Sequence, residues 1–80
     1  MAYKLTDMDN RSVFDAAIKS YVCSSEDDIA KLPKFGKVGT QVLNDGYDDT
    51  NNAPCGYGST AIVLGGNVYQ LFPNNEWSAL

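Results

Sequence analysis

The sequence contains no histidine, which removes the commonest general base and the commonest transition-metal ligand of proteins. Basic residues are also scarce, since six lysines and arginines stand against ten acids and the net charge is −4. An acidic chain gains nothing from the release of phosphate counterions, and this disfavours nucleic-acid binding. We therefore expect a protein that is not an enzyme and that has no nucleic-acid partner.

Cysteine is almost as rare. Cys23 and Cys55 lie far apart, form no C-x-x-C pair and have no histidine with which to complete a zinc site. No apolar run approaches a membrane span, and the first residues lack the apolar segment of a secretion signal. We expect synthesis in a reducing cytoplasm, no membrane association and two free thiols, although a Cys23–Cys55 disulfide stays an open alternative.

What is present is the composition of a small globular protein. The 80 residues are 44% hydrophobic and 20% charged, which predicts one domain over 1–80 and argues against wholesale disorder. A core of this size gives marginal stability, and such domains commonly gain stability from a disulfide, a metal or a partner. We expect the last of these, as a homo-oligomer or as many copies on a larger assembly.

The first 33 residues predict a helical arm. Apolar side chains at three- and four-residue spacing would share one face of a helix. These are Phe14, Ala17, Ile18, Tyr21 and Val22. A second, short helix is predicted from Glu26 to Leu32, because Ser25 and the acids after it suit a helix start and Pro33 ends it.

Residues 34–80 predict a β-rich part. Three apolar runs, 59–64, 67–72 and 76–80, are separated by the turn-forming segments Gly65-Gly66 and 73–75. They predict a three-stranded antiparallel meander, preceded by a strand over 40–43 and an exposed polar loop, 44–52. The predicted fold class is therefore α+β, with short N-terminal helices followed by the meander.

Three segments invite comparison with chemical sites. The acids of segment 45–51 could hold calcium, but their spacing departs from the EF-hand loop, so we favour a solvated turn and leave calcium binding open. Ser59 follows glycines without the lysine of a phosphate loop or the flanking glycines of a nucleophile elbow. Cys55 has no adjacent base. We predict no catalytic residue, no metal site and no cofactor.

The larger apolar side chains are the candidates for packing and for interfaces. In the predicted fold the sheet aromatics organise the core, and one helix face packs on them or on a neighbouring subunit. These candidates are Phe14, Ile18, Tyr21, Tyr69, Phe72 and Trp77.

Four short motifs recur together over residues 25–80: Ser25 to Pro33, Gly58-Ser59-Thr60-Ala61, Val68-Tyr69-Gln70-Leu71 and Glu76-Trp77. With these motifs the segment resembles a family of small proteins encoded among the head genes of tailed bacteriophages. The resemblance implies a structural protein of the virion, such as a capsid decoration, a head-fibre base or a neck or tail accessory. It implies partners among the capsid, neck or tail proteins, and it brings no catalytic residue with it.

Other functions stay open beside this one. Every lysine and arginine precedes Val38, so an acid-only second half could face the basic cleft of a host enzyme or defence nuclease and inhibit it. Exposed aromatics could instead bind carbohydrate.

Overall fold

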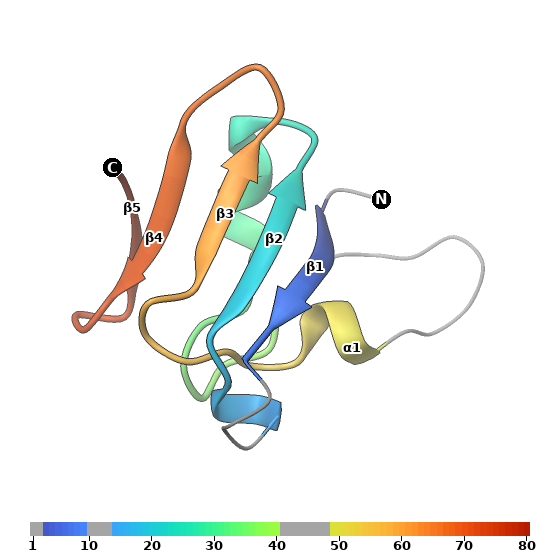
Figure 1. Ribbon diagram of the computed structural model, residues 1–80, viewed down its shortest axis with the longest axis vertical. Coiled ribbons are helices and arrows are strands. Elements are labelled where there is room, and N and C mark those ends of the chain that lie inside the picture. Colours follow the sequence, from blue (N-terminus) through green and yellow to red (C-terminus); the bar gives the residue numbers. More distant parts are fainter. Residues whose placement is uncertain (1–2, 10–13, 41–48) are drawn as a thin grey trace.

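A five-stranded mixed β-sheet forms the centre of the molecule, in a computed structural model that describes residues 3–9, 14–40 and 49–80 (Figure 1). The elements, with η for a 3-10 helix, are β1 (Tyr3–Met8), η1 (Phe14–Ala16), β2 (Lys19–Cys23), η2 (Glu26–Lys31), α1 (Asp49–Asn52), β3 (Thr60–Val63), β4 (Val68–Phe72) and β5 (Glu76–Ala79). The strands lie side by side in chain order. Strands β2 and β3 run parallel, and every other neighbouring pair is antiparallel.

The predicted α+β fold with a helical N-terminal arm is wrong, because the described parts of this arm before Ser24, residues 3–9 and 14–23, contribute two strands and a three-residue 3-10 helix. In β2, residues 19, 21 and 23 are buried while 20 and 22 are half-buried, which is the two-residue period of a strand. The helical spacing was misleading, since Ile18 and Tyr21 project to opposite faces of the sheet. Lys19 concealed the alternation, because a lysine at a buried position looks polar in the sequence.

The three strands predicted at the C-terminal end are present as β3, β4 and β5, in antiparallel pairs. They do not form a separate meander, since β3 also pairs with β2 and the sheet continues to β1. Most of the strand predicted over 40–43 lies outside the described residues, and Thr40 itself is in no strand. Of the polar loop predicted over 44–52, the structure describes 49–52, which form α1.

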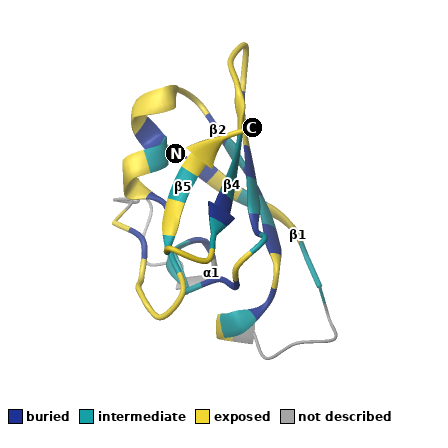
Figure 2. Ribbon diagram, turned by 90° about the vertical axis from the view of Figure 1, so that its left-hand side faces the viewer, coloured by how far each residue is buried: buried dark blue, intermediate teal, exposed yellow. Residues whose placement is uncertain are grey.

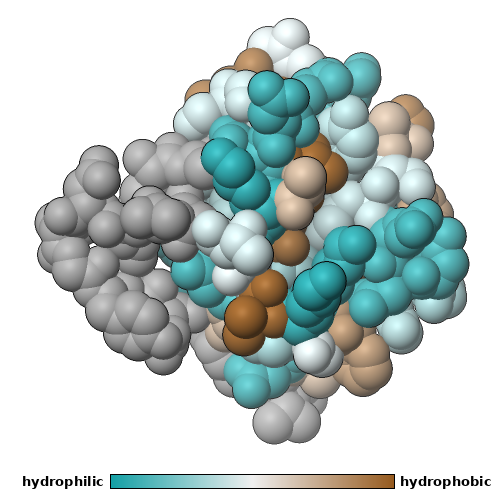
Figure 3. All heavy atoms as spheres, turned by 180° about the vertical axis from the view of Figure 1, so that it is seen from behind, coloured by the Kyte–Doolittle hydropathy of each residue, from teal (hydrophilic) through white to brown (hydrophobic). Residues whose placement is uncertain are grey.

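The long connection between β2 and β3 explains which side of the sheet is covered. Parallel neighbours cannot be joined by a tight turn, so the chain must cross over one face before it returns. The crossover carries η2, which lies behind the strands in Figure 1 and to one side of them in Figure 2. We call the covered side the inner face and the opposite side the outer face. Figure 3 shows the molecule from the covered side, where hydrophobic residues form only small separate patches among hydrophilic ones.

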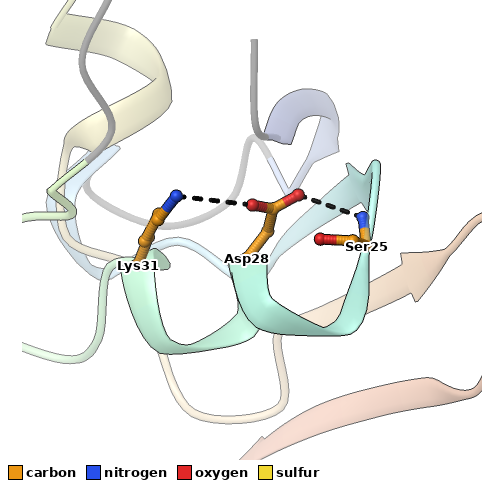
Figure 4. A network of polar contacts seen from close by, with 3 residues as sticks. All are labelled: Ser25, Asp28 and Lys31. Atoms are coloured by element: carbon orange, nitrogen blue, oxygen red, sulfur yellow. Dashed lines mark hydrogen bonds and ion pairs between the residues drawn. The ribbon is translucent and has the colours of Figure 1, made fainter.

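Helix η2 begins at the segment predicted as a short helix, and its polar groups explain why. The Asp28 carboxylate accepts a hydrogen bond from the backbone N–H of Ser25 at 3.0 Å, and Lys31 lies 3.7 Å from the same carboxylate (Figure 4). Asp28 is buried, so this pairing satisfies a charge that would otherwise be costly there.

The core lies between the inner face and the crossover. Tyr21 is at its centre, in edge-to-face contact with Tyr3 on one side and Trp77 on the other, at centroid distances of 5.9 and 6.2 Å. The core cluster consists of Tyr3, Tyr21, Cys23, Leu32, Cys55, Ala61, Val63 and Leu71, with Leu5, Ile29, Tyr69 and Trp77 packed against it. Residues of all five strands thus meet the crossover in one apolar layer.

Candidate functional site

The outer face carries side chains in three rows that run across the strands, because paired residues of neighbouring strands project to the same side. The first row is apolar, the second polar and the third apolar. The first row consists of Val22, Ile62, Val68 and Leu80. The second row consists of Ser20, Thr60, Gln70 and Ser78, and the third of Ile18 and Phe72. Within the polar row the hydroxyls of Ser20 and Thr60 lie 3.4 Å apart and share a hydrogen bond.

Large apolar side chains on this face are open to solvent. Ile62 is 49% exposed, Leu64 is 65% exposed and Leu80 is 72% exposed. Together with Ile18 and Val68, they make up five of the eight exposed large hydrophobic residues of the described chain. Single exposed apolar residues are ordinary, but several gathered on one face of a small domain mark an interaction surface.

Charge is confined to the edges of the same face. On the outward positions of β2, β3 and β4 there is no ionisable side chain. The charged outward residues of the strands are Lys4 and Asp7 on β1 and Glu76 on β5, the two edge strands. An uncharged centre with a charged rim is the usual anatomy of a protein interface, because charges at the centre would have to be desolvated.

Beneath the sheet lies a buried polar cluster, made by Lys19, Tyr21, Cys55 and Ser59. The Lys19 ammonium donates a hydrogen bond to the Pro54 carbonyl oxygen at 2.8 Å, and its backbone N–H donates to Ser59 Oγ at 3.0 Å. Ser59 in turn donates to the Gly56 carbonyl at 2.6 Å. These bonds tie the start of β2 to the end of the crossover.

The cluster lacks the exposure that covalent chemistry needs. Cys55 is fully buried, and burial raises the pKa of its thiol above the usual value, although Ser59, Tyr21 and Lys19 each act in the other direction. Burial also lowers the pKa of the Lys19 ammonium. Cys55 donates to the Pro33 carbonyl at 3.6 Å and therefore packs as a protonated core thiol rather than as a nucleophile.

The structure separates the six packing candidates. Tyr21 is in the core, and Tyr69 and Trp77 pack against it. Ile18 and Phe72 instead lie on the outer face, so Phe72 does not organise the core as expected. Phe14 begins η1, and the predicted helix face that would join it to Ile18 and Tyr21 does not exist.

The structure also bears on the hypotheses about the disulfide, the glycine-flanked serine and the calcium loop. Both cysteines are free and buried, so no disulfide joins them. Ser59 holds backbone groups together, which gives the glycine-flanked serine a structural role. Most of the candidate calcium loop, 45–48, lies outside the described residues. Elsewhere in the described chain, no three histidine, cysteine or acidic side chains are grouped as metal ligands would be.

Sequence reasoning missed Lys19 and the outer face. No local signal distinguishes a buried lysine from an exposed one. The outer rows could have been found from the alternation in β3 and β4, had the neighbouring strand β2 been recognised.

None of the helices in the described ranges is both long and apolar enough to span a membrane. In comparisons with known proteins, the chain matches no protein-family model, no curated protein and no solved structure.

Proposed function

We propose that this protein is a non-enzymatic structural or accessory subunit of a tailed-phage virion, which docks in multiple copies on the capsid, neck or tail. The outer face of the sheet is the docking surface. The observation that carries the proposal is this face itself, with its exposed apolar rows and its uncharged central strands. The resemblance of residues 25–80 to small phage head-gene proteins suggests the kind of assembly.

The dimensions of the molecule agree with this use. Seen along its shortest axis, the molecule extends 30 by 29 Å (Figure 1). A standard protein interface takes about 800 Å² from each partner, and the sheet face within this outline supplies part of that area. A small domain that docks in this way also gains stability from its partner, because binding to the folded state shifts the unfolding equilibrium.

The buried side chains whose chemistry most resembles that of catalytic residues support the proposal, because each has a structural role in the fold. Ser59 and Lys19 hold the crossover against the sheet, and the Cys55 thiol is enclosed and protonated. The contacts of these side chains thus stabilise the fold.

Reconstitution tests the proposal. Purified protein is added to particles that lack it, and association is measured by co-sedimentation, with wild type expected to bind in many copies. Val68→Asp places a carboxylate in the apolar row, and we expect binding at least roughly tenfold weaker, since a desolvated unpaired charge costs several kcal/mol. Val38→Asp is the matched control, because Val38 is 61% exposed but lies in the crossover.

Equal loss in both variants would contradict the outer face as the docking surface. A salt-sensitive one-to-one complex with a host protein, together with absence from purified virions by mass spectrometry, would contradict the virion role and favour the inhibitor.

A further inference from the structure

The free edge of β5 carries backbone groups that no described strand satisfies. Leu80 donates its N–H to the Val68 carbonyl at 2.9 Å, so residues 76, 78 and 80 direct their backbone groups toward β4. By the antiparallel alternation, Trp77 and Ala79 direct theirs away from β4. Strand β5 lies at the margin of the sheet in Figure 1, and three of its four residues are exposed. The N–H and carbonyl groups of Trp77 and Ala79 are therefore open to another strand.

The opposite edge of the sheet, formed by β1, is protected. Strand β1 contains a bulge between Leu5 and Asp7, and it carries Lys4. The side chain of Asn51 in α1 also accepts a hydrogen bond from the Leu5 N–H at 3.0 Å. Bulges, lysines and covering segments are devices that keep edge strands from pairing with other chains. Strand β5 pairs with β4 in continuous register, without a bulge, and it contains neither lysine nor proline.

A second copy of β5 can pair with this edge in a register that uses all of these groups. Antiparallel partners exchange two hydrogen bonds wherever two such residues lie opposite each other. When Trp77 lies opposite Ala79 of the second copy, both residues are satisfied in both copies, and residues 76–80 are paired throughout. When Trp77 lies opposite itself, Ala79 faces Asn75, which is in a turn with φ of 64° and not in a strand. The first register is therefore the better one.

The side chains that this register brings together are compatible in size and charge. The bulky Trp77 lies opposite the small Ala79 on the inner side, and the Ser78 hydroxyls of the two copies meet at a two-fold axis, where they can share a hydrogen bond. Glu76 is the only charged residue of β5, and it lies opposite Leu80 rather than opposite a second carboxylate. Like charges that face each other destabilise a strand pair, and this register avoids such a contact.

We propose that two copies of the chain pair through the free edge of β5, antiparallel about a two-fold axis at Ser78, and join their five-stranded sheets into one. The contact is isologous, because each copy gives the same strand and receives it, so it closes at a dimer. The polar rows of the two outer faces then meet through Ser78, and the faces form one surface. The pairing involves the edge rather than this face, so it does not depend on the virion role.

Sedimentation velocity of the purified chain tests the pairing. The contact is short, and contacts below about 1,200 Å² in total are of the weak, transient class. We therefore expect monomers at about 10 µM and a rise of the sedimentation coefficient toward that of a dimer at about 1 mM. A sedimentation coefficient that stays at the monomer value over this range would overturn the proposal.

Opposite charges at the two-fold axis give a sharper test. Ser78→Asp places two carboxylates directly opposite each other, and Ser78→Lys places two ammonium groups there. We expect each variant alone to dimerise roughly five- to tenfold more weakly than wild type at low salt. An equimolar mixture of the two variants should dimerise at least as well as wild type, because unlike charges then face each other. A mixture that stays as weak as the single variants would refute the register.

Two further variants separate the edge from the fold and from the outer face. Ala79→Pro removes an N–H that faces the second copy but none that faces β4, so we expect dimerisation at least roughly tenfold weaker, with thermal unfolding near that of wild type. Leu64→Asp adds the same charge as Ser78→Asp to the outer face, at a residue that is 65% exposed and follows the end of β3, and it should leave dimerisation unchanged. Unchanged dimerisation in Ala79→Pro, or equal losses in Leu64→Asp and Ser78→Asp, would each overturn the proposal.

Discussion

Gly56 lies where the end of the crossover meets the start of β2, and replacing it with alanine tests that contact. An added Cβ would lie 2.2 Å from the Ala16 carbonyl oxygen and 3.1 Å from its carbon. Both atoms are backbone, so no side chain can turn away. Gly56 itself is held by its N–H bond to the Ala17 carbonyl at 2.8 Å and by its carbonyl bond from Ser59. Relief of the clash therefore requires that these bonds lengthen.

We expect Gly56→Ala to lower the free energy of unfolding by about 3 kcal/mol, the upper part of the range for overpacking. That is a large share of the roughly 4–12 kcal/mol typical of a domain of this length. Urea titration followed by Trp77 fluorescence measures the loss.

The matched control is Gly65→Ala, where φ is +75° and nothing lies within 4 Å of an added Cβ. Here only backbone strain applies, and the expected loss is about 1 kcal/mol. If Gly56→Ala cost no more than this control, the close packing of the crossover on β2 would be refuted.

Three further predictions address the core and its titrating groups. Leu71→Ala, at 1% exposure, should lower the free energy of unfolding by about 2–5 kcal/mol in a urea titration. Ser59→Ala should lower it by about 1–3 kcal/mol, because the buried N–H of Lys19 loses its acceptor. Burial raises the pKa of Cys23 from 9.0 to about 11, so between these values the unfolded chain has lost a proton that the folded chain keeps. Stability should therefore fall by up to about 3 kcal/mol as pH rises from 9 to 11. Cys23→Ala should reduce the fall measured in titrations at both pH values, while the part that comes from the buried Cys55 thiol stays, and an unchanged fall would contradict this prediction.

The C-terminal strands were predictable because their signals are local. Apolar runs separated by Gly65-Gly66 and by the turn at 73–75 specify strand, turn and strand within a few residues. The turn at Asn75, with φ of 64°, is of the type that asparagine tolerates. Nothing in these signals states what pairs with the other side of β3.

The N-terminal half was not predictable in the same way, because its strands are specified by distant contacts. Strand β2 pairs with β3 forty residues later, as in the pair of Ser20 with Thr60. Its buried positions include Lys19, whose ammonium is bound there by the Pro54 carbonyl. A lysine that depends on a partner so far along the chain resembles a surface residue in every local pattern.

The candidate sites also combine features that are visible locally in the sequence with features that depend on distant contacts. Trp77 and Tyr69 could be chosen from the sequence as large aromatics, but not their position beside Glu26, which reaches them from the crossover. The outer face was hidden for a related reason, since its first row joins one residue from each of β2, β3, β4 and the end of β5. Such a row exists only once strand order and register are known.

The parallel pairing of β2 with β3 links these features. It forces the chain between Cys23 and Thr60 over one face, and the described segments leave the other face open. The inner face therefore receives the aromatic core, while apolar side chains such as Ile62 remain in contact with water on the outer face. At the other end of the strand order, no described strand pairs with the free side of β5. One choice of strand order thus leaves both an open sheet face and an open sheet edge.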